Sequence, residues 1–192
     1  MVLMALVDLQ YRFLWIDCGG VGSMSDAQIF NDSELKECRS DGSIGFPEPD
    51  PLPNDDQPTP YFILADDAFG LRTFLMKPYG RRGLDRQQRI YNYKVSSGHR
   101  VVENAFGIMA QRWQVLLSTM QQAPSVVQDI IECCVCLHNL MRERYPTLQN
   151  TLLDQEDDEH NMQPGEWRQE VNMHDIQQIV GDTVAGKKQR ES

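Results

Sequence analysis

The 192 residues contain no long hydrophobic run. The longest uninterrupted apolar stretch covers residues 1–7, far short of the roughly 18 residues that a membrane-spanning helix needs. The same stretch lacks a basic leader and a small-residue cleavage site, so it does not resemble a secretory signal. We therefore expect no membrane partner and an intracellular location.

Cysteine is also scarce. The chain has five cysteines, an odd number, and three of them crowd together at Cys133, Cys134 and Cys136. A chain of this size can bury one ordinary core and does not need disulfide cross-links. The sequence therefore predicts reduced thiols, which on one helix fan out around its axis and cannot converge on a single zinc ion. A redox or zinc protein built on these cysteines is an alternative that we favour less than the two functions given at the end of this subsection.

Basic residues are rare at the start of the chain and concentrated in its middle. Residues 1–71 hold 3 basic and 13 acidic side chains, whereas residues 72–112 hold 9 basic and 2 acidic ones. The formal net charge of −10 conceals this partition, and the local field decides which partners approach. We call residues 72–112 the basic segment.

Local signals predict the elements of the first half. Two β-prone runs, residues 2–7 and 12–16, flank a short polar connection and predict an antiparallel hairpin. Ser25 and Gln28 have capping-box spacing, which predicts a helix reaching about Cys38. Residues 39–60 hold six of the ten prolines and predict a surface loop. The apolar run at residues 61–65 predicts a strand buried on both faces.

Helical periodicity dominates the second half. Apolar residues at helical spacing predict one helix around Leu84–Val95, a second from Ser97 to Met120, and a third from Pro124 to about Tyr145. Beyond these, polar and acidic composition predicts a largely disordered tail over residues 147–192, apart from a short helix around residues 176–180. The sequence thus predicts one α/β domain over residues 1–146, followed by an acidic tail.

Two carboxylates suggest chemistry. Asp66 ends the apolar strand, and Glu103 borders the buried stripe of the long helix. Paired divalent ions that cleave phosphodiesters need hard oxygen ligands on rigid elements. From spacing alone, however, the favoured interpretation is an ordinary turn residue and an ordinary boundary carboxylate.

Three ordered motifs favour the metal site. The strings ADDAFGLRTFLMKPYGRR, GHRVVENAFGIMAQRW and CVCLHNLMR resemble segments of the PIF/Harbinger-type transposases and their nuclease relatives, and DCGGVGSMSDAQIF resembles the preceding block. This resemblance covers about residues 1–146. It implies a DDE endonuclease with a ribonuclease-H-like fold, a mixed sheet flanked by helices, and a two-metal site for Mg²⁺ or Mn²⁺. By position, Asp66 matches the second acid of the triad and Glu103 the third.

The resemblance also implies a loss. The first acid of the family lies on a strand before the hairpin, so we expect the chain to be truncated at its N-terminus, without that first strand. Two carboxylates offset the charge of two ions poorly, and we expect impaired catalysis. Asp17, Asp26 and Asp67 are alternative third ligands, although Asp26 suits a helix start and Asp67 should point away from Asp66.

All but the last nine residues of the basic segment lie between Asp66 and Glu103 or at Glu103 itself, where a polyanion would bind. We expect it to contact DNA phosphates, which gives salt-dependent affinity without sequence information. The alternative is a solvated helix face that balances the acidic segments. The predicted DNA-binding residues are Arg81, Arg82, Arg86, Arg89, Lys94, Arg100 and Arg112.

Two functions follow as expectations. The first is a divalent-metal-dependent DNA endonuclease of the transposase type, a hydrolase acting on phosphodiester bonds, impaired by the missing Asp. The alternative is a catalytically inactive, transposase-derived DNA- or protein-binding remnant. The resemblance further implies a nuclear location and a Myb-like accessory protein as a partner. For His138, in the Leu-His-Asn motif, we expect a packing or capping role rather than a functional one.

Overall fold

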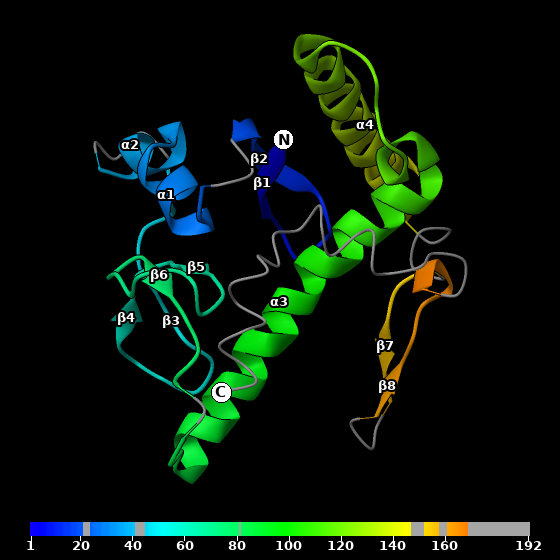
Figure 1. Cartoon of the computed structure of the whole chain (residues 1–192). Helices are drawn as coiled ribbons and strands as arrows, with labels where there is room; N and C mark the ends of the chain where they lie inside the picture. Colours follow the sequence, from blue (N-terminus) through cyan, green and yellow to red (C-terminus); the bar gives the residue numbers. More distant parts are fainter. Residues whose placement is uncertain (21–23, 41–44, 81, 147–151, 158–160, 169–192) are drawn as a thin grey trace. The chain divides into compact units, whose positions relative to one another are not determined.

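The computed structural model describes residues 1–20, 24–40, 45–80, 82–146, 152–157 and 161–168 (Figure 1). The chain divides into two compact units. Unit 1 comprises residues 1–23 and 101–192, and unit 2 comprises residues 24–100. Helices of the described residues lack an apolar stretch long enough to cross a membrane.

Unit 1 begins with the predicted hairpin. Strand β1 (Val2–Val7) pairs antiparallel with β2 (Phe13–Gly20), so the hairpin is confirmed, with a second strand that runs further than expected. The Asp8 carboxylate organises the turn by accepting hydrogen bonds from the backbone N–H groups of Gln10 and Arg12, each at 2.9 Å. Tyr11 adopts the left-handed conformation, with φ of 63°, as turns of this kind require.

The long helix α3 (Arg86–Arg112) has 27 residues, where the sequence predicts two helices. The prediction of a break is wrong because the segment contains no proline, and an interior glycine such as Gly98 costs a helix only about 1 kcal/mol. The helix also ends before Met120. A short 3-10 helix, η1 (Gln114–Leu117), follows it.

Helix α4 (Pro124–Arg144) confirms the third predicted helix, with proline in its first turn. It packs with α3 and the hairpin around a core that includes Phe13, Phe106 and Ile131. The rings of Phe13 and Phe106 meet edge to face, with centroids 5.2 Å apart. On α4, Leu137 is 39% exposed, whereas Val135 and His138 are buried.

Unit 2 contains short elements: α1 (Asp26–Asn31), α2 (Glu34–Ser40), β3 (Asp50–Pro51), β4 (Pro58–Thr59), β5 (Ile63–Leu64) and β6 (Leu75–Met76). The capping box is confirmed, since Ser25 and Gln28 exchange hydrogen bonds at the start of α1. The prolines of residues 39–60 lie on a largely exposed segment whose described part is irregular apart from the two-residue strand pair β3–β4, as expected of a surface loop. Within this segment, residues 41–44 lie outside the described residues.

The prediction of a strand buried on both faces at residues 61–65 is wrong. Only Ile63–Leu64 forms a strand, paired parallel with β6, and Tyr61 and Leu64 are 44% and 40% exposed. A continuous apolar run indicates a tendency to be buried but does not say what covers it. The described residues form two-stranded sheets. The mixed α/β class is confirmed, and the ribonuclease-H-like arrangement stays a prediction.

Part of the predicted tail is folded. Strand β7 (Gln155–Glu156) pairs antiparallel with β8 (Met162–Gln163), and the 3-10 helix η2 (Glu166–Arg168) follows. Leu153 and Trp167 are buried, and they form a second apolar cluster with Ile108 and Ala110 of α3. We call residues 152–157 and 161–168 the strap. The short helix predicted around residues 176–180 lies outside the described residues.

Candidate functional site

Glu103 lies on α3 within unit 1. Its side chain is 37% exposed, while the seven residues that follow it, 104–110, are all buried. This placement agrees with the helical-wheel expectation that Glu103 borders the buried stripe. The carboxylate is thus held on a rigid, well-packed helix and remains within reach of solvent.

A cation from the strap faces this carboxylate. Nη2 of Arg168 lies 3.4 Å from Oε2 of Glu103 and 2.5 Å from Oδ2 of Asp154. The guanidinium Nε also donates to both oxygens of Asp154, at 2.7 and 2.8 Å. Hydrogen bonding to Asp154 is the largest influence that raises the pKa of Arg168 above its ordinary value, and Glu103 adds to it. Arg168 therefore stays charged beside Glu103.

The strap is anchored next to this ion pair. The indole Nε1 of Trp167 donates to Oδ1 of Asn104 at 2.9 Å, and the Trp167 side chain is completely buried. Gly107 lies one helical turn further along α3, where any side chain would collide with the Trp167 ring. Gly165 is similarly required, because a Cβ there would meet the backbone of Leu152. The strap therefore fits α3 at close quarters.

Sequence reasoning missed Arg168 and Asp154 because both lie in a segment whose polar composition predicts disorder. The signal that could have found them is Trp167, a large apolar side chain in an otherwise polar stretch. Such a residue is seldom left in water without a partner surface.

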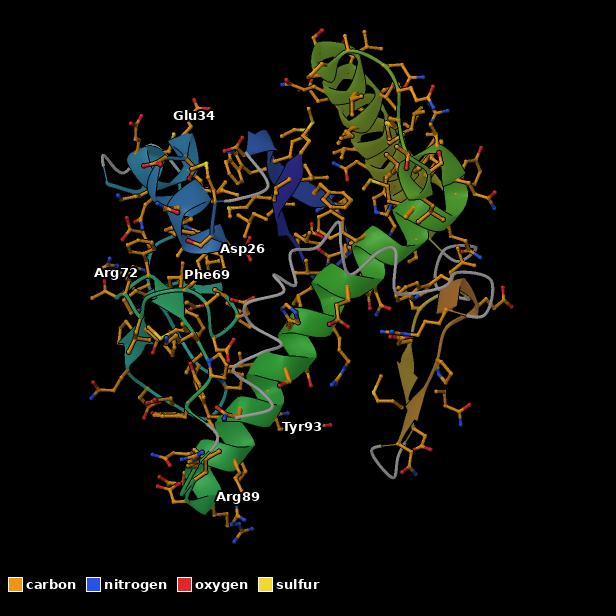
Figure 2. All side chains as sticks on the ribbon, in the orientation of Figure 1. Asp26, Glu34, Phe69, Arg72, Arg89 and Tyr93 are labelled. Carbon is orange, nitrogen blue, oxygen red and sulfur yellow. The ribbon has the colours of Figure 1, made fainter. Side chains whose placement is uncertain are left out.

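Asp66 lies in unit 2, just after β5. Its Oδ1 accepts a hydrogen bond from the backbone N–H of Ala68 at 2.9 Å, which closes an Asx turn. The carboxyl of Asp26, in the first turn of α1, lies within electrostatic reach. Burial and then the negative charge of Asp66 raise the pKa of Asp26. Figure 2 shows Asp26 beside the loop that carries Phe69. The ring centroids of Phe69 and of Phe30 in α1 are 5.9 Å apart.

Asp66 and Glu103 belong to different units, and their pairing stays a prediction. Carboxylate oxygens are the donors that Mg²⁺ and Mn²⁺ prefer, so the residues fit such ions in kind. Within the described ranges, no group of three or more His, Cys, Asp or Glu side chains could hold a metal ion.

The predicted DNA-binding residues lie mainly on α3. Arg86, Arg89 and Lys94 are exposed, and Arg100 is partly exposed. At about 100° per residue, Arg86, Arg89 and Arg100 fall within roughly 60° of one another around the helix. Figure 2 labels Arg89 near the start of α3. Arg81 lies outside the described residues.

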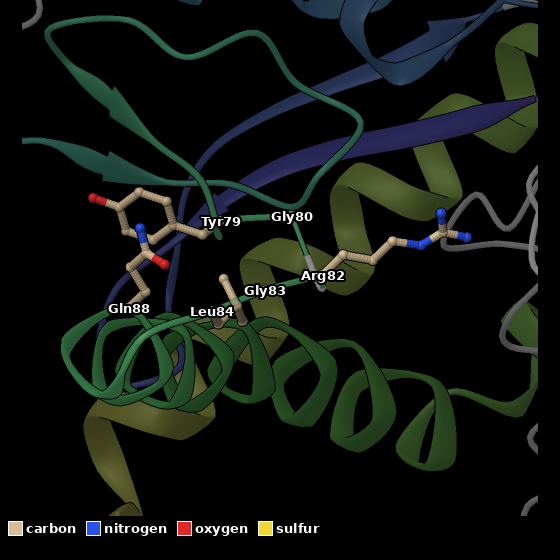
Figure 3. Close-up of a pocket in the computed structure, with 6 residues that line it drawn as sticks. All are labelled: Tyr79, Gly80, Arg82, Gly83, Leu84 and Gln88. Atoms are coloured by element: carbon tan, nitrogen blue, oxygen red, sulfur yellow. The ribbon is translucent and has the colours of Figure 1, made fainter.

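Two further basic residues have local contacts. Arg112, at the end of α3, stacks its guanidinium over the neighbouring Trp113 ring at 5.8 Å. Arg82 lines an open hollow of about 610 Å³ together with Tyr79, Gly80, Gly83, Leu84 and Gln88. Figure 3 shows the Arg82 side chain extending away from Tyr79 and Gln88. None of these lining residues carries a carboxylate, so the hollow contains neither Asp66 nor Glu103.

The Leu-His-Asn motif has a packing role, as expected. His138 is 1% exposed and its Nε2 lies 2.7 Å from the carbonyl oxygen of Tyr11. Burial is the main cause that lowers the pKa of His138 from 6.5 to about 4. Of the clustered cysteines on α4, Cys134 is buried, whereas Cys133 and Cys136 are exposed, consistent with side chains that fan around the helix.

Comparison with known proteins places the chain in a family. A sequence profile of the DDE superfamily endonuclease family matches residues 1–139. "Protein ALP1-like" of Arabidopsis thaliana is 27% identical over 142 residues, which cover 73% of this chain and 35% of the relative. "Putative nuclease HARBI1" of Homo sapiens is 26% identical over 139 residues, covering 71% of this chain and 36% of the relative. The match thus spans about a third of each relative's length.

No solved structure matches the chain significantly. The profile match covers most of the sequence and includes the positions of both Asp66 and Glu103. Members of such families cleave phosphodiesters with divalent ions held by carboxylates. The chain belongs to the DDE superfamily endonuclease family.

Proposed function

We propose that the chain is a divalent-metal-dependent DNA endonuclease domain of the Harbinger transposase type, in which Asp66 and Glu103 are metal ligands. The observation that carries the proposal is the family match over residues 1–139, which contains both acids. Glu103 supports it further, because its partly exposed carboxylate stands at the edge of an otherwise buried helix segment.

The roles of the residues follow from their chemistry. Bound Mg²⁺ or Mn²⁺ would supply activation of water and stabilisation of charge on the phosphodiester. Asp66 and Glu103 would hold the metal through carboxylate oxygens, and the basic side chains of α3 would bind the DNA phosphates. Since the 192 residues carry two acids that match the triad, we expect them to cleave slowly by themselves. We also propose a nuclear location and a Myb-like accessory partner.

Glu103→Ala tests the proposal. We expect Mn²⁺-dependent nicking of plasmid DNA by the wild-type chain and at least a tenfold loss of rate in the variant, since a lost metal ligand removes stabilisation of the transition state. Glu132→Ala is the matched control, because Glu132 is an exposed carboxylate on α4 whose side chain bonds to Gln128. Cleavage that survives Glu103→Ala unchanged would show that another site or a contaminant is responsible.

The alternative function is a non-catalytic DNA- or protein-binding remnant. The ion pair between Glu103 and Arg168 favours it, because a carboxylate engaged by a guanidinium is a poorer metal ligand. Absence of cleavage with Mn²⁺, together with DNA binding that weakens as salt rises, would favour this alternative over the nuclease.

A further inference from the structure

The guanidinium of Arg168 lies between two carboxylates, Glu103 and Asp154. Nη2 approaches Oε2 of Glu103 at 3.4 Å and Oδ2 of Asp154 at 2.5 Å. This is the position in which a bound cation would share the two carboxylates. Arg168 thus supplies one positive charge at the place where the proposed function requires a divalent ion to approach Glu103.

The strap fixes Arg168 in this position. Asp154 is 4% exposed and engages both Nε and Nη2, while the guanidinium carbon lies 4.3 Å from the centre of the Trp167 ring. The buried Trp167 is in turn bound to Asn104, the neighbour of Glu103. Arg168 therefore cannot swing away freely, because its movement would break the Asp154 contacts and disturb the anchor.

We propose that the strap is an autoinhibitory element, in which Arg168 acts as an internal counter-ion of Glu103 that a divalent ion must displace. The proposal rests on the proposed metal-binding role of Glu103. The contact with Glu103 is longer and more exposed than the contact with Asp154. Displacement can therefore begin at Glu103 while Asp154 keeps hold of Arg168.

The test uses the full chain and Mn²⁺ alone as the probe. Arg168→Gln by itself would leave the buried Asp154 carboxylate without its cation, which risks unfolding. The double variant Asp154→Asn with Arg168→Gln removes both charges, so the net charge is unchanged and a general field effect is avoided. The Mn²⁺ dissociation constant is measured by electron paramagnetic resonance, and broadening of the Trp167 indole N–H signal reports metal bound near Glu103.

We expect the double variant to bind Mn²⁺ about five- to tenfold more tightly than the wild type, because a competing positive charge has been removed. Adding Glu103→Gln should abolish this gain. Trp167→Phe serves to identify the indole N–H signal. Unchanged or weaker Mn²⁺ binding in the double variant would overturn the proposal.

A metal-free measurement separates failure of the strap from failure of the proposed function. Glu103→Gln should shift the Arg168 Nε–H signal in the nuclear magnetic resonance spectrum, since the two side chains are in contact. If the signal does not shift, the autoinhibitory contact is absent and the nuclease proposal still stands. A clear shift, combined with no Mn²⁺ binding at Glu103 even in the double variant, would overturn both proposals.

Discussion

Three side chains of α4 hold the turn of the β1–β2 hairpin through its backbone. His138 bonds to the carbonyl oxygen of Tyr11, and Arg142 Nε donates to that of Gln10 at 2.8 Å. Asn139 binds both the N–H and the C=O of Phe13, at 2.9 and 2.8 Å. These residues satisfy buried or half-buried polar groups that would otherwise cost about 1–3 kcal/mol each. The side chains of His138, Asn139 and Arg142 therefore have a structural role in this chain.

His138 makes stability depend on pH. Because its pKa is about 4 in the folded protein and 6.5 when unperturbed, the unfolded chain binds the proton more readily between these values. The contribution to the free energy of unfolding is fully present above about pH 6.5 and is lost as the pH falls toward 4. We expect a loss of about 3 kcal/mol over this interval, measured by urea unfolding at several pH values.

The matched variant for this measurement is His138→Gln, which keeps an N–H donor for the Tyr11 carbonyl and cannot titrate. The acidic groups shared by both proteins cancel in the comparison. The difference in stability between wild type and variant should therefore shrink as the pH falls from 6.5 to 4. A difference that stays constant would mean that His138 does not titrate as its burial implies.

At the scale of elements, local signals predict what is locally determined. The hairpin, the capping box at Ser25 and the proline at the start of α4 all depend on neighbouring residues, and all three are confirmed. The predicted burial of residues 61–65 fails because burial depends on what the rest of the chain provides. Likewise, the role of Trp167 depends on Gly107, which is distant in sequence and leaves room for the indole ring.

In the candidate site, too, some residues can be predicted from local sequence and others depend on contacts between distant parts of the chain. The motif resemblance points to the acids Asp66 and Glu103 without knowledge of the fold. The sequence does not predict the role of Arg168, because this role comes from the contact with Glu103 and from the packing of the neighbouring Trp167. No helical or strand periodicity marks that segment, so only the packed structure reveals the cation beside the carboxylate.

Gly107→Ala tests how closely the strap fits α3. Alanine in place of an interior helix glycine normally stabilises by about 1 kcal/mol. Here the added methyl group would collide with the Trp167 ring, and overpacking of this kind costs about 1–3 kcal/mol. We therefore expect a net decrease in the free energy of unfolding, measured by denaturant titration. The sign of the change is the informative quantity.

The control is the same substitution in a Trp167→Ala background, where the ring that obstructs the methyl group is gone. In that background Gly107→Ala should stabilise the protein, so the two measurements should differ in sign. Stabilisation in both backgrounds would mean that the strap is not seated against Gly107.

At the scale of the whole molecule, charge is distributed unevenly along an acidic chain. The basic segment carries half of the basic side chains, 9 of 18, and its exposed side chains on α3 are the strongest candidates for phosphate contacts. The strap and the α4 motif instead use arginine for internal contacts, as Arg168 and Arg142 show. We therefore expect the proposed DNA binding to depend on the exposed basic side chains of α3 and not on Arg168 or Arg142.

Neutralising the α3 face tests this division. The triple variant Arg86→Gln, Arg89→Gln and Arg100→Gln removes three charges that lie on one side of the helix. If each charge neutralises one phosphate, the slope of log affinity against log salt should decrease in magnitude by about three, since each contact contributes roughly 0.9. The slope is obtained from fluorescence anisotropy titrations of a labelled duplex at several salt concentrations.

Arg144→Gln is the control, because Arg144 is exposed at the end of α4 and lies outside the basic segment. We expect it to leave the slope nearly unchanged, and circular dichroism should show that the triple variant keeps its helices. If the triple variant binds DNA with the wild-type slope, the α3 arginines are a solvated face and the phosphate contacts lie elsewhere. The alternative interpretation of the basic segment would then be the correct one, because the charges of α3 would serve only to offset the acidic segments that flank it.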